Sequence, residues 1–211
     1  MSIEAVIFDC DGTLVDSLPL TAAVLVECLA DLGVVLSTSD AAVRFGDGRL
    51  ASALGEFERF LGYRLPTDFV PELRRRRERA VRTRLRAIEG AADLLNALRV
   101  PVAVASNGPL QQTRLSLEIT GLLHYFSANV FSAYELDAWK PDPKLFLHAA
   151  SVLGIHPSRC AVVEDGLTGI EAGVAAGMTV FALGHKDLWQ SERVRIVQCL
   201  DDVRRSLTGA A

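Results

Sequence analysis

Hydrophobic residues gather in five short runs along the chain, and each run ends in a polar or glycine-containing turn. The runs cover residues 5–8, 102–105, 129–131, 161–163 and 179–182. Because they are continuous rather than alternating with polar residues, they predict strands buried on both faces. Stretches with helical spacing occupy residues 90–98, 109–119, 143–153 and 167–176. Such alternation of strands and helices is typical of an α/β fold with a parallel sheet and crossover helices.

The interval after the first predicted strand does not fit this simple alternation. From Asp9 to Ser106 the chain is much longer than the roughly 30 residues that a βαβ unit needs. Helical apolar spacing recurs inside the interval, over residues 18–32, 40–62 and 67–87. Because long structureless loops are uncommon, we expect an inserted helical domain over 16–87 and an α/β core formed by 1–15 and 88–211.

The composition narrows the class of protein. The 211 residues are 50% hydrophobic and include 22 basic and 26 acidic residues, for a formal net charge of −4. This apolar content excludes global disorder, and the acidic balance disfavours general nucleic-acid binding. The sequence shows no signal-peptide pattern and no uninterrupted apolar stretch long enough for a membrane span. The four cysteines lack zinc-site spacing, so we expect reduced thiols in a cytoplasmic protein. The sequence leaves the oligomeric state open, and we favour a monomer.

Polar side chains stand where several predicted strands end. They are Asp9, Asp11, Ser106, Asn107, Glu164 and Asp165, and Lys140 lies just before a predicted helix. In an open parallel sheet, ligands bind outside the carboxyl ends of the strands, so we expect these side chains to meet there. Four carboxylates with a hydroxyl and an ammonium group suit a hard metal ion beside a phosphate. Mg²⁺ is the predicted cofactor, because it prefers oxygen ligands and is often shared between carboxylates and a substrate phosphate.

The same residue types can carry out phosphoryl transfer. A carboxylate such as Asp9 can attack phosphorus and form an aspartyl-phosphate. Asp11, two residues further on, can protonate the leaving oxygen and then activate water. Ser106 and backbone N–H groups at a helix N-terminus can hold phosphoryl oxygens, and Lys140 can neutralise their charge.

Four short motifs follow one another along the chain. They are Asp-Cys-Asp-Gly-Thr-Leu-Val-Asp-Ser at 9–17, Ser-Asn-Gly at 106–108, Lys-Pro-Asp-Pro at 140–143 and Glu-Asp-Gly at 164–166, with Gly169 close behind. Together they resemble the motifs of the haloacid dehalogenase-like hydrolase superfamily. The insertion resembles the helical cap of the phosphoglucomutase-like subgroup. This resemblance implies a Rossmann-like parallel sheet with an inserted helical cap, and a Mg²⁺-dependent phosphatase.

The resemblance also implies a role for each motif residue. Asp9 is the implied nucleophile and a metal ligand, and Asp11 the general acid and base whose backbone carbonyl also binds Mg²⁺. The remaining implied metal ligands are Asp165 and, directly or through water, Glu164. The implied phosphate-binding residues are Ser106, Asn107 and Lys140. Gly166 departs from the many relatives that carry serine or threonine there, so a hydroxyl beside the metal site is missing.

Four further segments, one of which overlaps the third motif, narrow the expected substrate. Residues 3–6, 87–90, 123–126 and 139–141 resemble bacterial sugar phosphatases that act on 6-phosphogluconate. The implied partner is a small phosphorylated metabolite, either a sugar or a sugar acid. In the insertion, Arg44 and Arg49 flank a glycine-containing turn, where an arginine can pair with a carboxylate or a second phosphate of the substrate.

Three alternative functions stay open or are disfavoured. A sugar phosphomutase uses the same core motifs, and the sequence does not separate it from a phosphatase. A non-catalytic phospholigand-binding protein is disfavoured, because it needs no nucleophile at Asp9. Eight arginines within 74–86 suggest nucleic-acid contact, but apolar residues form a stripe at helical spacing, made up of Leu73, Ala80, Val81, Leu85 and Ile88. We therefore expect arginines on a solvated helix face, with no nucleic-acid and no membrane partner.

Overall fold

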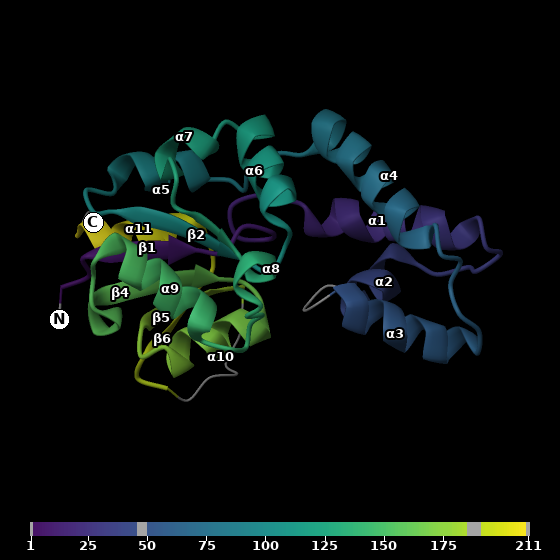
Figure 1. The fold of residues 1–211 in the computed structure, drawn as a ribbon. Coiled ribbons are helices and arrows are strands. Elements are labelled where there is room, and N and C mark those ends of the chain that lie inside the picture. Colours follow the sequence, from purple (N-terminus) through teal and green to yellow (C-terminus); the bar gives the residue numbers. More distant parts are fainter. Residues whose placement is uncertain (1, 46–49, 185–190, 210–211) are drawn as a thin grey trace. The chain divides into compact units, whose positions relative to one another are not determined.

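The computed structural model describes residues 2–45, 50–184 and 191–209. The chain divides into two compact units, one formed by Met1–Val15 with Ala87–Ala211 and the other by Asp16–Arg86 (Figure 1). Ala87 falls in the first unit rather than in the insertion, because an isolated antiparallel bridge joins it to Val15.

A six-stranded parallel sheet forms the centre of the first unit. The strands are β1 (Ala5–Phe8), β2 (Val102–Ser106), β3 (Val130–Ser132), β4 (Cys160–Glu164), β5 (Thr179–Leu183) and β6 (Val194–Val197). Their order across the sheet is β3-β2-β1-β4-β5-β6. The neighbouring strands β1 and β4 are buried along their whole length, as continuous apolar runs require. The predicted α/β class is therefore confirmed, together with all five predicted strands.

Helices cover both faces of this sheet, with α5 and α7 on one side and α9 and α10 on the other (Figure 1). The helices of the first unit are α5 (Ala91–Ala97), α6 (Leu110–Ile119), α7 (Leu123–Phe126), α8 (Ala133–Leu136), α9 (Lys144–Leu153), α10 (Leu167–Ala175) and α11 (Leu200–Thr208), with a short 3-10 helix, η1 (Pro157–Arg159). Pro109 and Pro143 are the N-cap residues of α6 and α9, so both helices begin one residue later than the predicted stretches 109–119 and 143–153. Both helices therefore begin directly after the segments that carry Asn107 and Lys140.

All described secondary-structure elements of the second unit are helices. It contains α1 (Leu18–Ala30), α2 (Thr38–Phe45), α3 (Leu50–Leu61) and α4 (Phe69–Arg84). The single helix expected over 40–62 is two helices, separated by residues 46–49, which lie outside the described part of the chain. Buried Leu29, Phe57 and Leu73 belong to an apolar cluster of this unit's own. The unit thus has a core of its own, separate from the one under the sheet.

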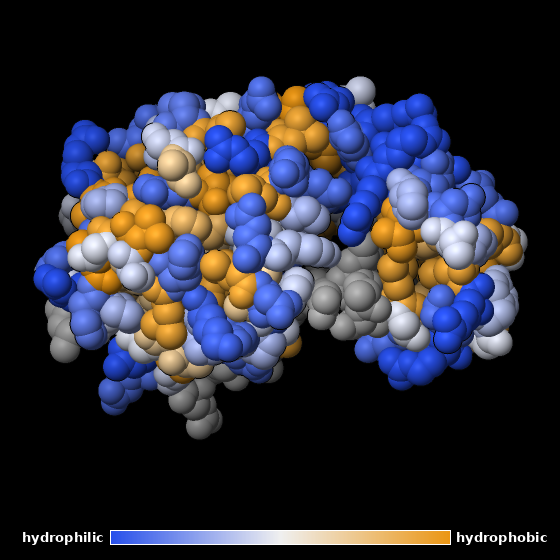
Figure 2. All heavy atoms as spheres, in the orientation of Figure 1, coloured by the Kyte–Doolittle hydropathy of each residue, from blue (hydrophilic) through white to orange (hydrophobic). Residues whose placement is uncertain are grey.

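The arginine-rich helix α4 has the two faces expected from its sequence. Leu73, Ala80, Val81 and the following Leu85 are buried, while six of the eight arginines are exposed and the other two, Arg76 and Arg77, are half-buried. Figure 2 shows the hydrophilic surface over this helix. Within the described residues, no helix is long and apolar enough to cross a membrane.

Candidate active site

Three carboxylates meet where two neighbouring strands end. Asp9 follows β1, while Glu164 and Asp165 lie at the end of β4, which pairs in parallel with β1. The backbone N–H of Asp9 donates to the carbonyl of Val163 at 3.0 Å, so the strand pairing fixes where Asp9 stands. One carboxylate oxygen from each of the three residues lies within 4.8 Å of the others. The parallel pairing therefore assembles an acidic cluster from two distant parts of the sequence.

Lys140 is buried in direct contact with this cluster. Its Nζ donates to Oδ1 of Asp9 at 2.5 Å and to Oε1 of Glu164 at 2.7 Å, and its side chain is only 2% exposed. The ammonium also lies 5.0 Å from the ring centre of Phe146, which shields it from water. Three carboxylates around one ammonium leave an excess of negative charge in a poorly solvated place.

The pKa values of these groups follow from burial and mutual charge. Burial raises the pKa of Asp9 well above its ordinary value, against the opposing effect of Lys140. Burial and the charge of Glu164 raise the pKa of Asp165 to about 7, although a hydrogen bond from Thr13 opposes the rise. Burial acts to lower the pKa of Lys140, but its two carboxylate partners outweigh this effect and raise it. Lys140 therefore stays charged, while Asp9 and Asp165 resist ionisation.

This donor set fits a hard divalent cation. All three cluster ligands are carboxylate oxygens, which Mg²⁺ prefers over nitrogen and sulfur. The excess negative charge that one lysine cannot balance would be balanced by a cation among the carboxylates. The chemistry of the residues thus agrees with the metal site expected from the sequence.

Hydrogen bonds from nearby residues hold two of the carboxylates in place. Thr13 is fully buried, and its hydroxyl donates to Oδ1 of Asp165 at 2.8 Å. The backbone N–H of Gly166 donates to Oε2 of Glu164 at 2.7 Å. With no side chain at Gly166, the backbone itself anchors Glu164 there.

The loop after β2 carries the predicted phosphate-binding residues. Ser106 is buried, and its Oγ accepts a hydrogen bond from the backbone N–H of Gly108 at 2.9 Å. The side-chain carbonyl of Asn107 accepts the backbone N–H of Lys140 at 3.0 Å, which connects this loop to the lysine. Asn107, predicted as a phosphate ligand, thus also orients the backbone beside Lys140.

The remaining predicted site residues lie apart from the acidic cluster or outside the described residues. Asp11 lies in the turn after β1, where Gly12 has a φ of 88° that favours glycine. The carboxylate of Asp11 is not one of the cluster; its Oδ2 lies near Gly108, 3.6 Å from where a Cβ would stand on that glycine. The side chain of Arg44, on α2, and all of Arg49 lie outside the described part of the structure.

Two buried hydroxyl residues that contact this site were not predicted from the sequence. Thr13 holds Asp165, and Ser132 donates to the carbonyl of Gly108. Ser132 ends β3, so the strand-end rule that selected Asp9 and Ser106 also applies to it. Thr13 is part of the first motif, and the only signal for it was a polar residue directly before the apolar pair Leu14 and Val15.

A parallel sheet with helices on both faces and an acidic cluster at its carboxyl edge, able to hold a hard cation, is the arrangement of an α/β enzyme. The haloacid dehalogenase-like hydrolase family matches residues 3–177, and the chain belongs to that family. It is 37% identical over 180 residues to a 6-phosphogluconate phosphatase of Escherichia coli, covering 85% of this chain and 81% of the relative. Hexitol phosphatase A of the same organism is 31% identical over 189 residues, covering 87% and 84% of the two chains.

A solved structure agrees with this membership. A haloacid dehalogenase family hydrolase from Deinococcus radiodurans with bound phosphate and sodium is 33% identical, with a TM-score of 0.79. The match covers 98% of this chain and 96% of the other. Family membership and the two curated relatives support a phosphatase.

Proposed function

We propose that the protein is a Mg²⁺-dependent phosphomonoester hydrolase that acts on a small phosphorylated sugar or sugar acid. The observation that carries this proposal is the buried contact of Lys140 with Asp9 and Glu164 beside Asp165. The relatives named for 6-phosphogluconate and hexitol phosphates support a sugar substrate, and 6-phosphogluconate is the first candidate. The phosphate bound to the Deinococcus radiodurans hydrolase supports a phosphate pocket in this fold.

In the proposed mechanism, Asp9 is the nucleophile. An oxygen of its carboxylate forms a bond to phosphorus while the bond from phosphorus to the sugar oxygen breaks, and Asp11 gives that oxygen a proton. Asp11 then takes a proton from water, whose oxygen attacks phosphorus as the bond to Asp9 breaks and phosphate leaves. Lys140 and Ser106 neutralise and hold the phosphoryl oxygens, as their positions beside Asp9 and in the loop after β2 suggest.

The cation would be held by the carboxylates of Asp9, Glu164 and Asp165 together with the backbone carbonyl of Asp11. When bound, it supplies positive charge that neutralises the substrate phosphate and the carboxylates. The residues of this chain keep the site ready for it, because Thr13 and the backbone of Gly166 hold Asp165 and Glu164.

We further propose that residues 16–87 serve as the helical cap of this family and determine the substrate. Arg44 and Arg49 are the proposed cap residues that contact the non-reacting end of the substrate. An arginine suits a carboxylate or a second phosphate, because its guanidinium donates two parallel hydrogen bonds to such groups. Replacing either arginine is then expected to raise KM for a sugar acid more than for its uncharged analogue.

The test is release of free phosphate from a panel of phosphosugars that includes 6-phosphogluconate, with and without Mg²⁺. We expect Mg²⁺-dependent release that falls by roughly a thousandfold or more in Asp9→Asn, the size of loss typical of a removed nucleophile. Asp93→Asn, at an exposed acid on α5, is the matched control and should keep full activity. Near-normal activity in Asp9→Asn would contradict the mechanism, and an isomeric phosphosugar instead of free phosphate would identify a mutase.

A further inference from the structure

Ser132 links β3 to the loop that carries the predicted phosphate ligands. It is 1% exposed and is the register partner of Ser106 across the parallel pair of β2 and β3. Its hydroxyl donates to the backbone carbonyl of Gly108 at 2.7 Å and accepts the backbone N–H of Tyr134 at 3.2 Å. One buried hydroxyl therefore connects the start of α8 to the loop after β2.

This contact fixes the peptide groups on both sides of Gly108. Its carbonyl accepts from Ser132, and its N–H donates to Oγ of Ser106 at 2.9 Å. Because Oγ of Ser106 already accepts that N–H, the proton of the same hydroxyl is directed away from Gly108. The orientation of the Ser106 hydroxyl thus depends on a glycine whose position depends on Ser132.

The loop after β2 is closely packed around Gly108, between Ser106 and Asp11. A Cβ on Gly108 would stand 3.2 Å from Oγ of Ser106 and 3.6 Å from Oδ2 of Asp11. Displacement of Gly108 would therefore alter the spacing between the hydroxyl of Ser106 and the carboxylate of Asp11. In the proposed reaction, both groups face the phosphoryl group.

We propose that Ser132 is a positioning residue for phosphate binding, acting through Gly108 on the Ser106 hydroxyl. The inference rests on the proposed function, since it takes the site of Ser106 to be a phosphate site. A purely structural role, in which Ser132 only caps the four-residue helix α8, makes a different prediction. Loss of a cap lowers stability but leaves the affinity for phosphate unchanged.

The experiment compares Ser132→Ala with a matched control, Ser116→Ala, in the full chain with Mg²⁺ present. Ser116 on α6 is also 1% exposed, but its Oγ has no hydrogen-bond partner among the described residues. The probe is inorganic phosphate, measured by calorimetric titration and as a competitive inhibitor of phosphate release. We expect phosphate to bind about tenfold more weakly in Ser132→Ala, within twofold of the parent protein in Ser116→Ala, and near normally in Ser132→Thr, which keeps the hydroxyl.

A second measurement does not depend on catalysis. Amide hydrogen exchange at Gly108 is expected to speed up about tenfold in Ser132→Ala and to stay unchanged in Ser116→Ala, because the peptide loses its buried anchor. If Ser132→Ala fails to fold, Ser132→Cys keeps nearly the same side-chain volume with a weaker donor and carries both measurements.

The outcomes separate this inference from the proposed function. Equal phosphate affinity in the two alanine variants overturns the inference while leaving Mg²⁺-dependent hydrolysis intact. A parent protein that binds phosphate yet releases none from any substrate contradicts the hydrolase proposal, and the affinity ratio of the variants still decides the role of Ser132. A parent protein that does not bind phosphate overturns both.

Discussion

At Gly169 the backbone of α10 lies directly against the side chain of Glu164. A Cβ at this position would lie 1.6 Å from Oε1 and 2.0 Å from Cδ of Glu164, far inside van der Waals contact. Gly169→Ala must therefore displace the Glu164 carboxylate from Lys140, at a cost of about 1–3 kcal/mol in strain. Because the displaced carboxylate belongs to the acidic cluster, we expect kcat/KM to fall by roughly tenfold to a hundredfold, a loss of transition-state stabilisation of about 1.4–2.8 kcal/mol. The affinity for Mg²⁺ should fall with it, as titration would show.

Gly173→Ala on the same helix is the control for this prediction. A Cβ there would meet Cγ2 of Val180 at 2.7 Å, in the apolar core rather than at the site. The control should lower the melting temperature while leaving kcat/KM and Mg²⁺ affinity close to normal. If both alanine variants lost activity in proportion to their loss of stability, the proposed effect through Glu164 would be wrong.

The residues around Gly169 show which parts of the site the sequence can predict. Asp9, Glu164 and Ser106 could be found because parallel strands bring their carboxyl ends to one edge. The contacts that hold them could not be found in the same way. Thr13 reaches Asp165 and Asn107 reaches Lys140 only after the sheet has brought distant segments together. No rule of local sequence spacing predicts such pairs, so these hydrogen bonds could be identified only from the structure.

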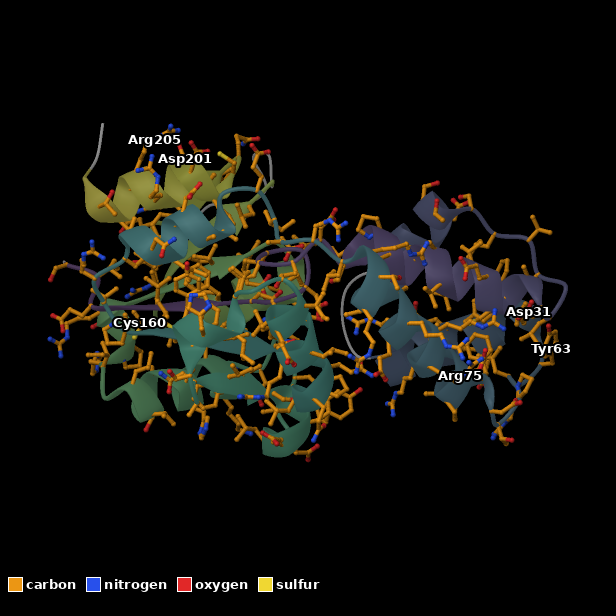
Figure 3. The ribbon with its side chains drawn as sticks, turned by 90° about the horizontal axis from the view of Figure 1, so that it is seen from above. Asp31, Tyr63, Arg75, Cys160, Asp201 and Arg205 are labelled. Atoms are coloured by element: carbon orange, nitrogen blue, oxygen red, sulfur yellow. The ribbon has the colours of Figure 1, made fainter. Side chains whose placement is uncertain are left out.

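Within a single element, the ion pairs on α4 give a prediction about pH. Hydrogen bonds from Arg75 and Arg76 lower the pKa of Glu72 from 4.5 to about 2, and Arg76 also reaches Asp31 after α1 at 2.6 Å. Figure 3 shows Asp31 and Arg75 within the second unit. The pKa of Glu72 is lower in the folded state than in the unfolded state. The ion pairs of Glu72 therefore stabilise the fold fully at a pH above the unfolded-state pKa, and this stabilisation is lost as the pH falls through the folded-state pKa. It should therefore disappear between about pH 5 and pH 2.

The measurement is the melting temperature of Glu72→Gln and of the parent protein across this pH range. At neutral pH the variant should melt slightly lower, because the pair is partly exposed and partly screened. This gap in melting temperature between the parent protein and the variant should close as the pH falls towards 2. Glu56→Gln on α3, whose only ion pair among the described residues is a 4.0 Å contact with exposed Arg59, should show almost no gap at any pH. A gap for Glu72→Gln that did not change with pH would contradict the assignment.

The helices and strands also differ in how well they could be predicted from the sequence. The central strands could be predicted because burial on both faces demands unbroken apolar runs. The edge strand β6 could not be predicted in this way. Only Val197 of its four residues is buried, so its sequence does not form a continuous apolar run. α7 and α8 have four residues each, which is too short for helical periodicity to show. The sequence between α2 and α3 contains glycines at positions 46 and 48, and a prediction based on apolar spacing alone does not take glycines into account.

At the scale of the molecule, the acidic cluster and the second unit belong to different bodies, each with its own apolar cluster. A ligand that binds only the folded first unit stabilises that unit by mass action, by about 2.7 kcal/mol at a hundred times its dissociation constant. Trp139 packs against the apolar cluster of the first unit, and residues 16–86 contain no tryptophan, so tryptophan fluorescence reports the unfolding of the first unit. We expect Mg²⁺ to raise the midpoint of thermal unfolding, followed by tryptophan fluorescence, by on the order of 5 °C.

Far-ultraviolet circular dichroism reports the helices of both units, so the two signals together separate the units. If the second unit unfolds independently, the dichroism curve should contain a component that Mg²⁺ does not move. Asp165→Asn removes one carboxylate of the cluster and should abolish the Mg²⁺ shift, whereas Asp93→Asn, an exposed acid of the same unit, should retain it. An equal Mg²⁺ shift in parent and Asp165→Asn would mean that the cation stabilises the protein at some place other than the carboxyl edge of the sheet.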